Sequence, residues 1–98
     1  MAHIYYLENL VNKKIYIGKT YKVPPRLCYN RIMRGRLKTE KFLNEDVEKY
    51  GKENFFFFII GEFPDEKVNE WQNYYIKKFN SYHENGFGYN MKENYNAI

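Results

Sequence analysis

Two short β-prone runs near the N-terminus constrain the fold of this chain more than any other feature. Residues 3–7 and 14–18 are rich in β-branched and aromatic side chains, and a polar stretch with two asparagines connects them. Such runs with a short Asn-containing connection predict an antiparallel hairpin. The hairpin can bring the hydroxyls of Tyr5 and Tyr16 together, and phenols can orient water or exchange protons. Because the chain has eleven tyrosines, the residues alone equally allow two ordinary strand tyrosines.

The rest of the chain shows three helical stretches and one further strand. Helices are predicted over about residues 25–34 and 39–49, between proline and glycine breakers. The apolar run at residues 55–60 predicts a strand buried on both faces. A last helix is expected from about residue 64 to residue 79 or 80, followed by a loop. The order β-β-α-α-β-α predicts an α/β (α+β sandwich) fold, with a small three-stranded, mostly antiparallel sheet flanked by helices, in a single domain over residues 1–98.

The last predicted helix contains one polar residue close to its apolar stripe. Spacing places Val68, Trp71, Tyr75 and Phe79 on an inward face, with Gln72 at its border. A polar side chain on an inward face requires a hydrogen-bonding partner or a site to serve. Gln72 is therefore a candidate functional residue.

Charge distribution indicates the kind of partner. Nine basic residues and no acidic one lie between Lys13 and Lys38, within a net charge of +4. A one-sided basic block favours a polyanion such as nucleic acid over the alternative, a solvated helix face. The single Cys28 excludes an intramolecular disulfide and a multi-cysteine zinc site. With no membrane-spanning run and no signal peptide, we expect an intracellular, cytoplasmic protein without a membrane partner.

Five ordered blocks resemble the GIY-YIG nuclease family and cover essentially the whole chain. The first is the hairpin, with a histidine where the family usually has glycine and with the second tyrosine motif intact. The blocks are His3-Ile4-Tyr5 with Tyr16-Ile17-Gly18, Arg26 in the basic helix, the run Lys49-Tyr50-Gly51-Lys52-Glu53-Asn54-Phe55, the run Asn73-Tyr74-Tyr75-Ile76-Lys77-Lys78-Phe79-Asn80, and Gly88-Tyr89-Asn90. The resemblance implies a metal-dependent endonuclease that hydrolyses phosphodiester bonds in DNA, with Mg²⁺ or Mn²⁺ as cofactor.

The resemblance also assigns roles to individual residues. Tyr5 and Tyr16 would be catalytic, with one of them activating water, and Arg26 would hold the scissile phosphate through its guanidinium group. Asn90 would support the site by hydrogen bonding, although by chemistry alone it is more typical of a turn. The expected nucleic-acid-binding residues are Lys14, Lys19, Lys22, Asn30, Arg31, Arg34 and Arg36.

The metal position departs from the family pattern. The resemblance places a metal-binding glutamate where this chain has Gln72, which keeps the shape of glutamate but lacks the charge that hard cations prefer. Glu70 lies about 200° around the helix and is expected to point away. Gln72 is either a deliberate inactivating change or a natural one in a protein that lost its activity. The retained tyrosines, Arg26 and Asn90 favour the first explanation.

Alternative functions follow from this substitution. The chain with Gln72 is expected to cleave DNA very poorly, and a catalytically silent nucleic-acid-binding module is the alternative; a purely structural protein explains the basic block poorly. Asn30 and Leu37 stand where many homing-type members have histidines, so no histidine-based step is expected there. His3 can contact the site, whereas His83 is expected to be exposed. The choice between DNA and RNA, the recognition sequence and the oligomeric state stay open. So does the biological role, which can be in a mobile element, a phage or viral genome, restriction or repair.

Overall fold

A three-stranded antiparallel sheet forms the middle layer of the domain. The computed structural model describes residues 1–21, 24, 27–34, 41–86 and 88–91. Strands β1 (Ala2–Asn9), β2 (Ile15–Thr20) and β3 (Phe55–Phe63) are arranged in the order β2-β1-β3, with β1 in the centre and both pairings antiparallel. This architecture confirms the predicted α+β fold and its element order.

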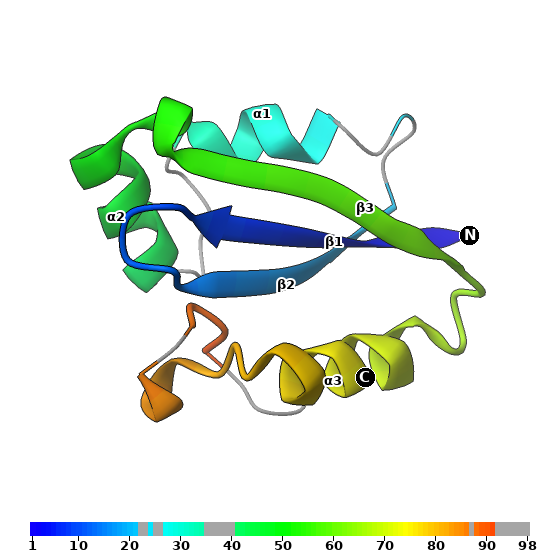
Figure 1. Ribbon diagram of the computed structural model, residues 1–98. Coiled ribbons are helices and arrows are strands. Elements are labelled where there is room, and N and C mark those ends of the chain that lie inside the picture. Colours follow the sequence, from blue (N-terminus) through cyan, green and yellow to red (C-terminus); the bar gives the residue numbers. More distant parts are fainter. Residues whose placement is uncertain (22–23, 25–26, 35–40, 87, 92–98) are drawn as a thin grey trace.

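Helices cover both faces of this sheet. The described α-helices that precede β3 lie on one face, and the described α-helix that follows it lies on the other (Figure 1). None of the helices within the described ranges is long and apolar enough to span a membrane. In chain order the helical elements are α1 (Leu27–Met33), α2 (Lys41–Tyr50), the 3-10 turn η1 (Lys52–Asn54), α3 (Val68–Phe79) and the 3-10 turn η2 (His83–Asn85).

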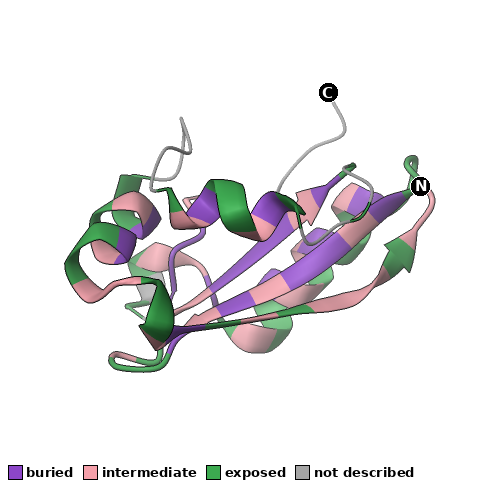
Figure 2. Ribbon diagram, turned by 90° about the horizontal axis from the view of Figure 1, so that it is seen from above, coloured by how far each residue is buried: buried purple, intermediate pink, exposed green. Residues whose placement is uncertain are grey.

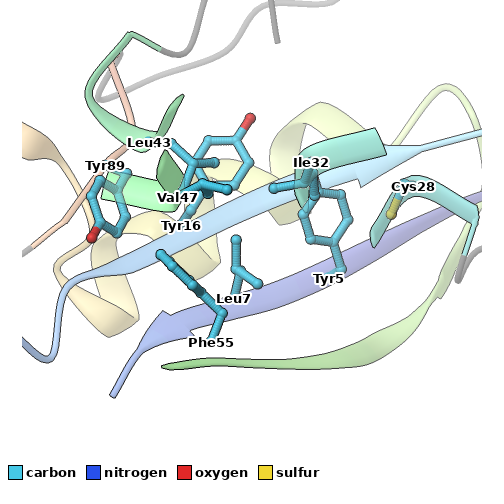
Figure 3. Packing of buried hydrophobic residues seen from close by; sticks show 9 residues of the cluster. All are labelled: Tyr5, Leu7, Tyr16, Cys28, Ile32, Leu43, Val47, Phe55 and Tyr89. Atoms are coloured by element: carbon cyan, nitrogen blue, oxygen red, sulfur yellow. The ribbon is translucent and has the colours of Figure 1, made fainter. Parts of the chain in front are cut away.

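Strand alternation divides the core into two clusters. Side chains on one face of the sheet, such as Tyr5 and Leu7, pack against α1 and α2 (Figure 3). Their neighbours on the other face, such as Ile4 and Ile17, pack against Val68 and Ile76 of α3. Because successive strand residues point to opposite faces, each strand contributes to both clusters.

The β1–β2 connection confirms the predicted hairpin. The side-chain oxygen of Asn9 accepts a hydrogen bond from the Val11 amide at 2.9 Å, and that of Asn12 accepts one from the Lys14 amide, also at 2.9 Å. Lys13 adopts a left-handed conformation with φ of 67°. The asparagines thus satisfy the backbone of the turn locally, as such residues do in Asx turns.

The prediction that the third strand is buried on both faces is wrong. β3 is an outer strand, and its Phe56 and Phe58 are 49% and 40% exposed. Figure 2 shows exposed and intermediate residues along this strand, at the margin of the sheet. A continuous apolar run is equally compatible with an edge position, because the order of strands depends on pairing between distant segments.

The inward face of the last helix also differs from the prediction. α3 begins at Val68, after a turn closed by a hydrogen bond from the Lys67 amide to the Pro64 carbonyl at 2.9 Å. Its buried residues are Val68, Gln72 and Ile76, whereas Trp71 is exposed. Gln72 is therefore central on the buried face rather than at its border.

In its described part, the segment after α3, which was predicted to be a loop, contains a 3-10 turn and two isolated β-bridges. Gly88, Tyr89 and Asn90 are buried, and the short parallel bridge Ile15↔Gly88 joins this segment to β2. His83 is half-buried and stacks on exposed Phe42 of α2 at 4.7 Å between ring centroids, so the predicted exposure of His83 is wrong.

The structure describes the C-terminal ends of the two middle helices. α1 ends at Met33, and α2 ends at Tyr50, where the Gly51 amide donates to the Val47 carbonyl at 3.0 Å. Residues 25, 35 and 39, proposed as helix boundaries, lie outside the described residues.

Candidate active site

Tyr5 and Tyr16 lie on the same side of the hairpin and are both buried. Their ring centroids are 5.9 Å apart (Figure 3). The register places Gly18 opposite Tyr5, and a Cβ atom at Gly18 would lie only 2.1 Å from the Cζ of Tyr5. Glycine is therefore required at this position for the Tyr5 ring to lie across β2.

Asn90 closes the outer edge of β2. Its Oδ1 accepts a hydrogen bond from the Ile17 amide at 2.9 Å, and its Nδ2 donates to the Ile17 carbonyl at 2.8 Å. The neighbouring Tyr89 amide donates to the Ile15 carbonyl at 2.8 Å, and Ser81 Oγ donates to Asn90 Oδ1 at 2.6 Å. The side-chain amide of Asn90 thus pairs with the backbone N–H and C=O of Ile17, as the backbone of a neighbouring strand would. Ile17 lies between Tyr16 and Gly18.

Gln72 reaches the same backbone position from α3. Its side chain is only 2% exposed, and its Nε2 donates to the Ile17 carbonyl at 3.1 Å. Within the described part of the chain, its Oε1 is buried without a hydrogen-bonding partner. Such an atom is costly unless it serves a site, because nothing replaces the water it lost. Gln72 and Asn90 therefore share the Ile17 carbonyl, next to Tyr16 in the chain, whereas the Tyr16 ring packs on the opposite face of the sheet, against α1 and α2.

The residues present do not fit a tightly bound divalent cation. Across the described ranges, no three His, Cys, Asp or Glu side chains gather closely enough to hold a metal ion. Gln72 supplies one neutral oxygen, and exposed Glu70 instead forms an ion pair with Lys67 at 3.8 Å. Mg²⁺ prefers charged carboxylates, and position 72 offers none.

The predicted nucleic-acid-binding residues that the structure describes occupy two places in the fold. Asn30 and Arg31 are exposed on α1, and Arg34 is exposed just after it, on the layer that covers the two tyrosines. Lys14 and Lys19 are half-buried at and beside β2, and the Lys19 ammonium donates to Asn69 Oδ1 on α3. Burial lowers the pKa of Lys19. Three predicted site residues, Lys22, Arg26 and Arg36, lie outside the described residues.

A buried polar cluster at the turn end of the hairpin was not predicted. The Tyr89 hydroxyl donates to Asp46 Oδ2 at 2.6 Å and accepts from Asn9 Nδ2 at 3.0 Å. Asn12 Nδ2 donates to the same Asp46 oxygen at 3.1 Å. Burial and the neighbouring Asp46 carboxylate raise the pKa of Tyr89 above its usual range. No local pattern signals this cluster, because Asp46 and Tyr89 are 43 residues apart.

This cluster anchors the segment that carries Asn90, so its loss should lower stability. We expect Asp46→Ala to reduce the free energy of unfolding by about 1–3 kcal/mol, because the Tyr89 hydroxyl loses its charged acceptor. Urea denaturation measures the change. Glu48→Ala, on the exposed side of the same helix, is the matched control and should change stability little. Equal effects of the two substitutions would contradict an anchoring role for Asp46.

Comparison with known proteins agrees with the resemblance inferred from the five sequence blocks. Residues 1–90 match the model of the GIY-YIG catalytic domain. A glutamate-to-alanine mutant of the catalytic domain of intron endonuclease I-TevI is 28% identical, with a TM-score of 0.73, over 97% of this chain and 98% of that one. The catalytic domain of homing endonuclease I-TevI is 25% identical, with a TM-score of 0.72, over 94% and 99%. Comparison with curated protein sequences gave no match. The chain therefore belongs to the GIY-YIG catalytic domain family.

Proposed function

We propose that residues 1–98 form a single endonuclease domain that hydrolyses phosphodiester bonds in DNA. We also propose that the form with glutamate at position 72 requires Mg²⁺ or Mn²⁺, and that Gln72 leaves the present chain strongly impaired. Membership of the family supports nuclease activity. The observation that carries the rest is the buried Oε1 of Gln72, which has no hydrogen-bonding partner among the described residues. The same side chain donates a hydrogen bond to Ile17, the residue that follows Tyr16.

The proposed division of labour follows from the arrangement around β2. The hydroxyl of Tyr5 or Tyr16 would orient the attacking water or accept its proton, because phenols can do both. Arg26 would hold the scissile phosphate through paired N–H donors. Asn90 would keep β2 in position through its two hydrogen bonds to Ile17. A divalent ion bound to the glutamate form would stabilise the charge that develops on the phosphate.

The exposed face of α1 supports contact with DNA. Asn30, Arg31 and Arg34 are available to phosphate groups, since they lie on the outside of the layer that covers the tyrosines. Exposed arginines such as Arg31 and Arg34 bind the phosphates of the nucleic-acid backbone irrespective of the base sequence. The full proposed set is Lys14, Lys19, Lys22, Asn30, Arg31, Arg34 and Arg36.

A plasmid-cleavage assay with Mg²⁺ tests the proposed function by comparing the present chain with Gln72→Glu. We expect nicked and linear products from the glutamate variant and almost none from the present chain, because the substitution adds the charge that a hard cation prefers. Gln72→Met, which fills similar space without an oxygen ligand, is the matched control and should stay inactive. Addition of EDTA should abolish cleavage by the glutamate variant.

One alternative outcome would change the assignment. If Gln72→Glu cleaves no DNA with Mg²⁺ or Mn²⁺ yet binds it with an affinity that falls steeply with salt, the domain is a catalytically silent nucleic-acid-binding module. The unpartnered oxygen of Gln72 would then have no cation to bind.

A further inference from the structure

The outer edge of β3 is open along most of its length. β3 is the last strand in the order β2-β1-β3, and beyond Phe55 no backbone hydrogen bond joins its outer edge to another described element. Figure 2 shows the strand along the margin of the sheet. Exposed edges are usually protected by lysines, prolines, bulges or short length. The register of β3 against β1 shifts once, after Ile59, and residues Phe55–Ile59 pair without irregularity. The nine residues Phe55–Phe63 include neither lysine nor proline, and Glu62 is their one charged residue.

Two exposed aromatic rings lie beside this open edge. Phe56 and Phe58 are two residues apart and share one face of β3, with ring centroids 5.7 Å apart. Phe58 also stacks on Tyr6 of β1 at 4.8 Å, which fixes its orientation against the sheet. An apolar surface that continues into unpaired backbone groups is suited to accept an additional strand.

We propose that this edge binds β3 of a second copy of the same chain, antiparallel and about a two-fold axis. Antiparallel pairing of identical strands is self-complementary, so one set of residues serves both copies. With Phe57 opposite its own counterpart, Phe56 faces the partner's Phe58, and Phe58 faces the partner's Phe56. Directly opposed aromatic side chains stabilise antiparallel pairs, and both pairs form on the exposed face. The two sheets then join into one of six strands.

The charges at the two ends of β3 favour this orientation. Lys52 precedes the strand and Glu62 lies near its end. The Glu62 carboxylate lies 3.6 Å from His3 Nε2 of its own copy but is 54% exposed. In an antiparallel pair each lysine approaches this glutamate of the other copy, whereas a parallel pair brings like charges together. The adjacent Glu53 does not cancel the charge of Lys52 at the strand edge, because its carboxylate lies over Gly51. A Cβ atom added at Gly51 would be only 2.7 Å from Glu53 Oε1.

The proposed dimer has a consequence for the candidate site. A two-fold axis perpendicular to the sheet keeps the Tyr5 and Tyr16 faces of both copies on the same side. The two β2 strands become the outer edges of the joined sheet, about 24 Å apart at five steps of about 4.8 Å. Two sites would therefore face a single bound substrate from one side of the dimer.

Sedimentation equilibrium over a range of concentrations tests this pairing. We expect a reversible dimer of the present chain, and Phe58→Lys or Phe56→Lys should weaken its association at least about tenfold, since a charge beside the edge opposes pairing. Tyr74→Lys is the matched control, because Tyr74 is 50% exposed on α3 and its ring contacts Trp71 and Tyr75 of the same helix. It should leave the dimer unchanged. Circular dichroism verifies that each variant is folded.

Amide hydrogen exchange distinguishes edge pairing from packing of the aromatic faces. Pairing should slow the exchange of outward-pointing amides in β3 as concentration rises, and Phe58→Lys should remove this protection. A chain that stays monomeric at several hundred micromolar overturns the proposal. Loss of the dimer in Tyr74→Lys also overturns it, because the aromatic surface of α3 would then form the contact.

Discussion

Replacing Tyr16 by phenylalanine in the Gln72→Glu form is expected to slow plasmid cleavage about 100-fold or more. The reason is that the substitution removes a hydroxyl proposed to orient water or accept its proton, a role that typically contributes 10²–10⁴-fold. The ring itself remains, and its contact with Tyr5 at 5.9 Å is retained, so the fold should change little. Single-turnover cleavage with Mg²⁺ measures the rate without a contribution from product release.

Tyr6→Phe in the same background is the matched control for Tyr16→Phe. Tyr6 lies on the α3 side of the hairpin, and its hydroxyl donates to Glu8 at 2.7 Å. Its loss should leave the cleavage rate within a few-fold. Comparable losses in both variants would attribute the effect to hairpin stability and contradict a chemical role for Tyr16. Retention of full activity by Tyr16→Phe would leave Tyr5 as the tyrosine to test.

Gly88→Ala is expected to lower the free energy of unfolding by about 3 kcal/mol, the upper range for overpacking. A Cβ atom at Gly88 would lie 1.9 Å from the backbone oxygen of Ser81. That backbone cannot move easily, because the Ser81 amide donates to the Ile76 carbonyl at 3.0 Å and the Ser81 carbonyl accepts from the Asn90 amide at 2.9 Å. Urea denaturation monitored by circular dichroism measures the change.

The same substitution should also affect the candidate site. Because Gly88 bridges to Ile15 and precedes Asn90, its displacement would loosen the hydrogen bonds that close the edge of β2. Gly61→Ala is the matched control, since a Cβ there would find its nearest neighbours, atoms of Phe63, at an ordinary 3.5 Å. It should change stability by less than about 0.5 kcal/mol. A similar small effect of Gly88→Ala would contradict the close packing of this segment.

Local patterns predicted the elements better than their positions. The hairpin was predictable because strand periodicity and turn-forming asparagines act within a few residues. The edge position of β3 was not predictable, because an apolar run does not specify which strands pair with it. For the same reason, helical periodicity predicted a helix around Gln72 but placed Trp71 on the buried face, where the structure has Gln72 itself.

The candidate site shows the same division. Its residues were named from motifs, but the reason for their proximity lies in contacts between distant segments. Asn90 and Ile17, which share two hydrogen bonds, are 73 residues apart, and Gln72 reaches the same carbonyl from 55 residues away. The hydrogen bond between Asp46 and Tyr89 could not be predicted from local patterns, because the two residues come together only when the chain folds.

The sequence by itself determined the hairpin, the order of elements, the basic block and the family resemblance, since each is encoded in neighbouring residues or in ordered motifs. Only the tertiary structure decided that β1 is central. It also decided that, among the described residues, nothing pairs with the outer edge of β3, and that the buried Oε1 of Gln72 finds no partner among them, beside the strand of Tyr16. The physical reason is that burial and hydrogen-bond satisfaction are properties of the assembled layers. They arise when segments 55 to 80 residues apart come into contact.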